Sequence, residues 1–120
     1  MKKFLASLGH AIHGIRHAVA EERNLKIQLA AFILAMVAAL LLRISRLELL
    51  AVLGISALVL ALELANTALE RLADRVSSEP DSRIGIAKDV MAGAVLLAAV
   101  FAAVIGLLVF LPPLLLLLRG

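Results

Sequence analysis

Four polar side chains follow one another at helical spacing in the segment ELANTALERLAD, residues 63–74. Glu63, Asn66, Glu70 and Asp74 are separated by three, four and four residues, so an α-helix places them on one narrow face. Mg²⁺ is usually held in proteins by one or two carboxylates together with the phosphates of a nucleotide. A carboxylate beside a substrate hydroxyl can also act as a general base. The pattern therefore predicts a site where a metal-bound nucleotide and a hydroxyl group meet.

These residues lie at the end of an apolar run in a strongly apolar chain. The chain has 120 residues, of which 63% are hydrophobic and 18% are charged. A soluble domain this short exposes too much of its surface for that composition, so an integral membrane protein is predicted. A carboxylate at the centre of a bilayer costs about 2.5–3.5 kcal/mol even on a lenient insertion scale. Glu63, the deepest acid, is therefore a candidate functional residue.

Three apolar runs predict membrane-spanning helices that would position the polar residues. The predicted spans are residues 25–43, 47–70 with a continuation to about 76, and 86–111. Pro112 and Pro113 are expected to end the third span, because proline removes a backbone donor. Residues 112–120 then form a tail on the outer side. The predicted fold class is an all-α membrane protein with a single domain over residues 1–120.

Residues 1–23 predict an amphipathic helix that lies on the membrane surface. One stripe is apolar and the opposite one carries basic and histidine side chains; the apolar members are Leu5, Leu8, Ile12, Ile15 and Val19. His10, His13, Arg16 and His17 interrupt the apolar part, so it lacks the continuous core of a signal peptide and is expected to be retained.

The lysines and arginines predict the topology. With a cytoplasmic N-terminus, nine of the 12 fall on the cytoplasmic side, and Arg43, Arg46 and Arg119 remain outside. The chain has no cysteine, which excludes disulfides and thiolate chemistry. With 3% aromatic residues, nothing resembles the basic and aromatic surface of a nucleic-acid-binding protein.

Small residues recur at four-residue spacing in each predicted span. The repeats are Ala31, Ala35 and Ala39; Ala57, Ala61 and Ala65; and Ala94, Ala98, Ala102 and Gly106. Such repeats let membrane helices approach closely, which favours packing within and between subunits. The alternative is a composition that is simply rich in alanine.

Three sequence blocks resemble those of a known enzyme family. ERNLKIQ, LELANTALERLADRVSSE and AKDVMAGAVLLAA are similar to the signature blocks of the small bacterial integral-membrane lipid kinases, the diacylglycerol kinase and undecaprenol kinase family. The resemblance implies ATP-dependent phosphorylation of a lipid alcohol in the bacterial cytoplasmic (inner) membrane. It also implies a homotrimer of three-span subunits, with active sites shared between neighbours at the cytoplasmic interface. Generic nucleotide motifs such as the P-loop are missing from the sequence.

The resemblance also implies roles for individual residues. Glu63 matches the catalytic base, and Glu22 and Glu70 match the residues that hold the Mg²⁺ bound to ATP. The nucleotide-binding positions are Lys3, His10, Asn66, Asp74, Glu79, Lys88 and Asp89. The lipid-binding positions are Arg16, Asn24, Gln28 and Glu63. Lys3 and His10 stand where some members have Arg and Tyr, and Gln28 stands where others have an acid or a His.

Other functions remain open from the residues alone. In an oligomeric cation or proton channel, Glu63 from each subunit would line an axial path, but the first and third predicted spans offer no acid in their cores. A purely scaffolding protein explains the small-residue repeats and leaves the polar face unexplained.

Individual polar residues also have simpler interpretations. Glu70 and Asp74 can be solvated charges at a helix end, paired with Arg71 and Arg75. His10, His13 and His17 have spacing that suits zinc, although a polar stripe facing the lipid headgroups explains them more simply.

Overall fold

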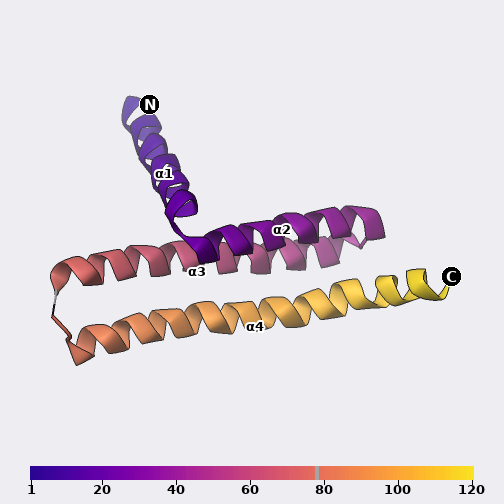
Figure 1. The fold of residues 1–120 in the computed structure, drawn as a ribbon. Helices are drawn as coiled ribbons and strands as arrows, with labels where there is room; N and C mark the ends of the chain where they lie inside the picture. The colour runs from indigo at the N-terminus through magenta and orange to yellow at the C-terminus, as the bar shows by residue number, and fades with distance from the viewer. Residues whose placement is uncertain (78) are drawn as a thin grey trace.

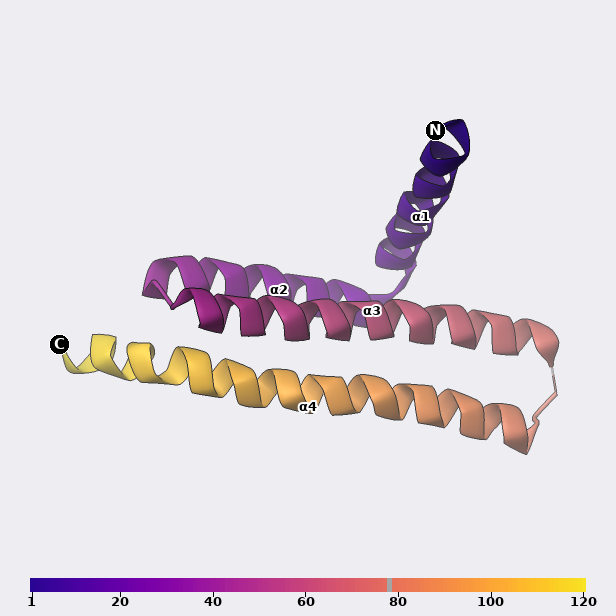
Figure 2. The same ribbon diagram turned by 180° about the vertical axis from the view of Figure 1, so that it is seen from behind.

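The structure, a computed structural model, has four α-helices in the part of the chain that it describes. It describes residues 1–77 and 79–120; Ser78, which belongs to the predicted cytoplasmic loop, lies outside the described residues. The helices are α1 (Lys2–Glu21), α2 (Arg23–Leu42), α3 (Arg46–Val76) and α4 (Ser82–Arg119). In both views α2, α3 and α4 lie side by side, whereas α1 projects away from them at a steep angle (Figures 1 and 2). No strand occurs in the described part of the chain, so the all-helical class is confirmed.

Three of the helices are long and apolar enough to cross a membrane, as predicted: α2 with 20 residues, α3 with 31 and α4 with 38. At 1.5 Å per residue a helix of 20 residues is about 30 Å long, which matches the hydrocarbon core of a bilayer. By the same rise α3 is about 46 Å long, so about one-third of it must extend beyond the core. The polar residues at its C-terminal end can therefore stand at the membrane surface.

A single residue, Glu22, separates α1 from α2. Its backbone is extended, with φ −99° and ψ 114°, and it is both the C-cap residue of α1 and the N-cap residue of α2. The Glu22 amide donates to the Ala18 carbonyl at 2.8 Å, and its carbonyl accepts from the Lys26 amide at 3.2 Å. Because both helical ladders continue up to this residue, the chain changes direction without a loop. Glu22 is thereby fixed at the corner between α1 and the first candidate span.

Capping side chains define the turns between the long helices. The α2 helix ends at Leu42, and the next residue, Arg43, has a left-handed backbone with φ of 51°. This conformation lets the Ile44 amide donate to the Ala39 carbonyl at 3.3 Å. Ser45 and Glu48 then form a capping box at the start of α3, with bonds of 3.2 and 2.8 Å. The result is a tight turn, as expected around RISRLE.

The fourth helix begins earlier and ends later than the sequence predicts for the third span. Asp81 Oδ1 accepts from the amides of Arg83 (2.9 Å) and Ile84 (3.4 Å), which starts α4 at Ser82. The prediction that Pro112 and Pro113 end the helix is wrong, because α4 continues through both to Arg119. Proline has a helical φ, although it removes one hydrogen bond and crowds the carbonyl four residues earlier, and the leucines that follow favour the helix. In an apolar environment a continued helix also satisfies the remaining backbone groups.

Few side chains are buried within the single chain, and an unusual share of them is polar. The buried apolar residues are Ala18, Leu25, Ala39, Val52, Val59, Ala98 and Val109, and the buried polar residues are Glu63, Asn66 and Thr67. Large aliphatic side chains instead cover the outside, for example Leu40, which is 77% exposed, and Leu108, which is 70% exposed. An apolar outside around a partly polar interior suits a chain surrounded by lipid or by other copies of itself.

Candidate active site

The buried polar residues lie together on α3. Glu63 is 4% exposed, Asn66 9% and Thr67 5%. Spacings of three and four residues place them on one side of the helix, and Glu70 continues that side one turn later. Exposure rises from Glu63, which is buried, through Glu70, which is half-buried, to Asp74, which is exposed. The predicted polar face therefore leads from the interior of the helix bundle to solvent.

Glu63 is hydrogen-bonded to the neighbouring helix. Gln28 Nε2, from α2, donates to Glu63 Oε2 at 3.2 Å. The bond fixes one carboxylate oxygen in a neutral contact with an amide, and no basic side chain pairs with Glu63 among the described residues. Glu63 thus combines deep burial with a held orientation, which is the arrangement a general base needs.

Two buried acceptors beside Glu63 have no hydrogen-bond partner within the described part of the chain. They are Gln28 Oε1 and Asn66 Oδ1. A buried acceptor without a donor costs about 1–3 kcal/mol. Such acceptors suit a site that is completed by another molecule, such as a hydroxyl group, a metal ion or a second subunit.

An arginine connects the corner at Glu22 to α3. Arg71 Nη2 contacts Glu22 Oε1 at 3.2 Å, and Arg71 Nη1 contacts His17 Nε2 at 2.6 Å. Because guanidinium only donates, His17 Nε2 accepts this bond. The arginine therefore holds the last turn of α1 and the junction residue at the same time. The sequence suggested Arg71 as a partner for Glu70; the structure pairs it with Glu22 instead.

A second ion pair joins α3 to α4 nearer the loop. Lys88 Nζ lies 3.1 Å from Asp74 Oδ1. Both side chains border an open cavity of about 610 Å³ that Glu79 and Asp81 also line. The sequence suggested Arg75 as the partner of Asp74, and the structure places Lys88 there. Three of the predicted nucleotide residues, Asp74, Glu79 and Lys88, thus meet around one cavity.

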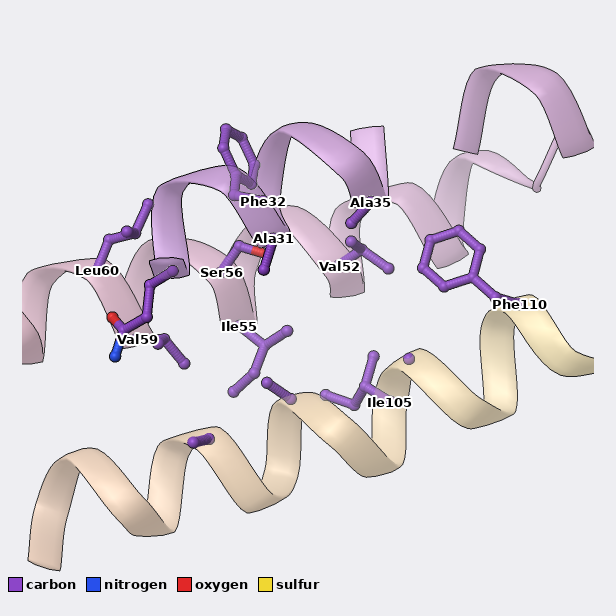
Figure 3. A pocket seen from close by; sticks show the side chains of 14 residues that line it. Ala31, Phe32, Ala35, Val52, Ile55, Ser56, Val59, Leu60, Ile105 and Phe110 are labelled. Carbon is purple, nitrogen blue, oxygen red and sulfur yellow. The ribbon is translucent and has the colours of Figure 1, made fainter. Parts of the chain in front are cut away.

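An apolar cavity begins beside Gln28 and continues between the three long helices (Figure 3). Its volume is about 240 Å³. The lining residues come from α2, α3 and α4 and include Ala31, Ala35, Val52, Ile55, Val59, Ile105 and Phe110. Gln28, the hydrogen-bond partner of Glu63, also lines it. Gln28 therefore links the buried polar site to an apolar cavity.

Several predicted site residues lie apart from this cluster in the single chain. Lys3 and His10 lie in the half of α1 that projects away from the other helices (Figures 1 and 2). Arg16, Asn24 and Asp89 are exposed and have no side-chain hydrogen bond or ion pair within the described residues.

The donors available to a metal ion are oxygen atoms. Glu22 and Glu70 offer carboxylates and Asn66 an unpartnered buried amide oxygen, which is the ligand chemistry of Mg²⁺. No group of three or more His, Cys, Asp or Glu side chains with metal-site geometry occurs among residues 1–77 and 79–120. Mg²⁺ needs only one or two carboxylates when phosphates complete its shell, so these residues fit it. The three histidines form no such group either, although His13 and His17 stack with ring centroids 6.5 Å apart.

Sequence reasoning missed Arg71, His17 and Thr67 as members of the cluster. Thr67 lies four residues after Glu63 and so shares its side of the helix, and the helical spacing alone could have included it. Arg71 stands between acids at Glu70 and Asp74, and a cation in such a segment signals a pairing role. Its partners come from α1 and the junction, 54 and 49 residues away, which spacing does not reveal.

Known proteins resemble this chain over most of its length. Residues 9–110 match the family described as prokaryotic diacylglycerol kinase. The diacylglycerol kinase of Synechocystis sp. is 39% identical over 112 residues, which is 92% of this chain and 64% of that protein. The undecaprenol kinase of Bacillus subtilis is 34% identical over 114 residues, 95% of this chain and 93% of that protein. The chain therefore spans less than two-thirds of the first relative and nearly all of the second.

Proposed function

Because this chain belongs to the prokaryotic diacylglycerol kinase family, we propose that it is a lipid kinase that transfers the γ-phosphoryl group of ATP to the hydroxyl of a membrane lipid alcohol. The acceptor is diacylglycerol, giving phosphatidic acid, or undecaprenol, giving undecaprenyl phosphate. One observation carries the proposal: a carboxylate that is 4% exposed lies on a membrane-spanning helix and is hydrogen-bonded at the edge of an apolar cavity.

Glu63 is the general base of the proposed reaction. Gln28 holds Oε2, which leaves Oε1 to take the proton of the lipid hydroxyl. The hydroxyl oxygen forms a bond to the γ-phosphorus, and the bond from that phosphorus to the bridging oxygen breaks, so that ADP leaves with the electron pair. Phosphoryl transfer needs little covalent help from a protein, so positioning and charge neutralisation provide most of the catalysis.

Glu22 and Glu70 would hold Mg²⁺ with the ATP phosphates, and the bound metal supplies positive charge against the charge that develops on the transferring group. Lys88 contacts phosphate in this proposal, and Asn66, Asp74, Glu79 and Asp89 complete the nucleotide site. The cavity that Asp74, Glu79 and Lys88 line supports this assignment. Lys3 and His10 are also proposed to contact the nucleotide. For that contact, the nucleotide must reach the part of α1 that projects away from the other helices.

The apolar cavity supports a lipid substrate. A hydrocarbon chain placed between α2, α3 and α4 would bring its head to Gln28, and the polar end of such a lipid would then lie beside Glu63. Arg16 and Asn24, close to the junction at Glu22, are proposed to contact the headgroup. The cavity has a volume of only about 240 Å³, so it suits part of one hydrocarbon chain of a lipid.

The assembly proposed is a homotrimer in the bacterial inner membrane, with the N-terminus in the cytoplasm. In this arrangement α1 lies on the cytoplasmic leaflet, and neighbouring subunits complete the active sites. The unpartnered buried acceptors support a site that other groups complete. The exposed small residues Ala57, Ala61 and Ala65 on α3 support close packing against a second copy.

Phosphate transfer from labelled ATP to the two lipids tests this function. We expect the purified protein with Mg²⁺ to phosphorylate at least one of diacylglycerol and undecaprenol in mixed micelles, and no transfer when chelator removes the metal. The ratio of the two kcat/KM values identifies the preferred acceptor. The absence of label in either lipid, from a folded protein that binds Mg-ATP, would contradict the proposal.

A further inference from the structure

We propose that Arg71 is a positioning residue that holds Glu22 in the metal-free protein and releases it when a divalent cation binds. This inference rests on the proposed function, because it takes Glu22 as a ligand of that cation. The proposed reaction gives Arg71 no role. This inference gives it one that can be measured, namely its effect on the affinity of the site for a divalent cation.

The geometry gives one guanidinium two partners, one near the C-terminal end of α1 and one at the α1–α2 corner. Arg71 Nη2 lies 3.2 Å from Glu22 Oε1, and Nη1 lies 2.6 Å from His17 Nε2. Within the described residues, these are the two side-chain hydrogen bonds that join residues 1–22 to α3. The side chain of Glu22 is therefore placed by α3 as well as by its own extended backbone.

The position of Arg71 in the sequence makes the contact relevant to the metal. Arg71 directly follows Glu70, the other proposed metal ligand, so the contact draws Glu22 toward the part of α3 that carries Glu70. While the ion pair holds Glu22 Oε1, a cation and the guanidinium compete for that oxygen. In this proposal Arg71 both orients Glu22 toward α3 and competes with the metal for its carboxylate.

The ion pair is weak enough to be exchanged. The side chains of Arg71 and Glu22 are 42% and 32% exposed, and half-exposed ion pairs are screened by solvent. A divalent cation has twice the charge of the guanidinium and is attracted by both Glu22 and Glu70. After exchange Arg71 keeps its contact with His17, so α1 stays attached to α3.

Manganese binding without nucleotide tests the competition. The full chain is purified in detergent, and free Mn²⁺ is measured by electron paramagnetic resonance during a titration. We expect Arg71→Ala to bind Mn²⁺ about two- to fivefold more tightly than the parent, the range to which a half-exposed ion pair corresponds. Arg71→Gln, which removes the charge and keeps a polar side chain of similar shape, must show the same gain if Arg71→Ala fails to fold.

Two further variants distinguish the contact between Arg71 and Glu22 from the general effect of a positive charge on α3. Arg75 lies one turn after Arg71 on the same side of α3 and makes no hydrogen bond or ion pair within the described residues, so Arg75→Ala should leave the Mn²⁺ affinity within about twofold. Arg71→Lys keeps the charge but cannot hold two acceptors with one planar group, so it should give a smaller gain. Equal gains in Arg71→Ala and Arg75→Ala would overturn the proposal in favour of a general charge effect.

Combining Arg71→Ala with Glu22→Gln tests whether the gain in Mn²⁺ affinity depends on the Glu22 carboxylate. In Glu22→Gln protein, the Arg71→Ala change should add no Mn²⁺ affinity. A gain that persists there, or no gain in the parent background, overturns the proposed competition while lipid phosphorylation still stands on its own assay. If Glu22→Gln alone leaves the Mn²⁺ affinity unchanged, Glu22 is not a ligand, and that assignment fails together with this inference.

Discussion

At the scale of single residues, the central feature is an acid whose surroundings are almost entirely uncharged. Glu63 is 4% exposed and its one described polar partner is the neutral amide of Gln28. An ionised carboxylate in such a place is costly unless it is hydrogen-bonded or paired. A chain that needed only packing at this position would be more stable with an apolar side chain. The burial of Glu63 is therefore better explained by the reaction than by the fold.

Gln28 provides a test of how Glu63 is held. Gln28→Leu keeps a similar volume and removes the hydrogen bond to Glu63 Oε2. We expect kcat to fall about 10- to 100-fold, because a hydrogen bond to a charged group contributes about 1.5–3 kcal/mol. Lipid phosphorylation at saturating ATP measures the effect. The control is Ser56→Ala, which removes a hydroxyl from the apolar cavity that Gln28 also lines and should change kcat less than twofold. Equal losses of kcat in both variants would show that Gln28 does not hold Glu63 as proposed.

The identities of the polar residues were predictable, and their partners were not. The helical spacing of Glu63, Asn66 and Glu70 predicts their common face, because the spacing belongs to one element. The contact between Gln28 and Glu63 spans 35 residues and joins two helices. Its existence depends on the depth and rotation of α2 relative to α3, which the sequence of neither helix specifies. The partners of Arg71 escaped prediction for the same reason.

At the scale of elements, the length and ends of the helices position the site. The excess length of α3 carries Glu70 and Asp74 past the apolar segment, and the extended backbone at Glu22 turns the chain so that α1 leaves the bundle beside them. The apolar runs predicted the existence of all three long helices because length and hydropathy decide it. The end of α4 was not predictable from Pro112 and Pro113, since the prolines' effect on the helix has to be weighed against the cost of leaving backbone groups unsatisfied in an apolar environment.

The attachment of α1 to α3 predicts a measurable change in its orientation. The chain has no cysteine, so Ser7→Cys on α1 and Val76→Cys on α3 give two unique spin-label sites per chain. We expect Arg71→Ala to broaden the distribution of distances between the labels, because both described side-chain bonds from α3 to residues 1–22 are lost. Pulsed electron resonance on labelled chains diluted with unlabelled ones measures it. The label pair in an Arg75→Ala background is the control, and an unchanged distribution with Arg71→Ala would contradict the attachment.

At the scale of the whole molecule, the single chain is an open arrangement of helices. Its dimensions are 59 × 42 × 22 Å, and most large apolar side chains lie on the outside. Gln28, the partner of Glu63, lines an apolar cavity, and Asp74 and Lys88 border an open cavity near the loop between α3 and α4. A lipid and a nucleotide can thus approach the same helix from different directions. The arrangement suits a reaction between a membrane-bound and a water-soluble substrate.

Self-association predicts a sensitive position on α3. Ala61 lies in the middle of the exposed repeat of Ala57, Ala61 and Ala65. We expect Ala61→Leu to weaken the proposed trimer and to lower activity together with it, because small residues allow close helix approach and one larger side chain separates the backbones. Native mass spectrometry from detergent measures the number of copies. Ala103→Leu, at an exposed position of α4 outside the repeats, should leave three copies; a parent protein that is monomeric and fully active would contradict the proposed assembly.

The most direct test of the account is the turnover of Glu63→Gln. This change keeps the size and hydrogen-bonding capacity of the side chain and removes its ability to take a proton. We predict that lipid phosphorylation falls at least about 100-fold, the lower range of general-base contributions, while Mg-ATP affinity and helix content stay within about twofold of the parent. Glu63→Gln protein that phosphorylates diacylglycerol or undecaprenol at the parent rate would contradict the account.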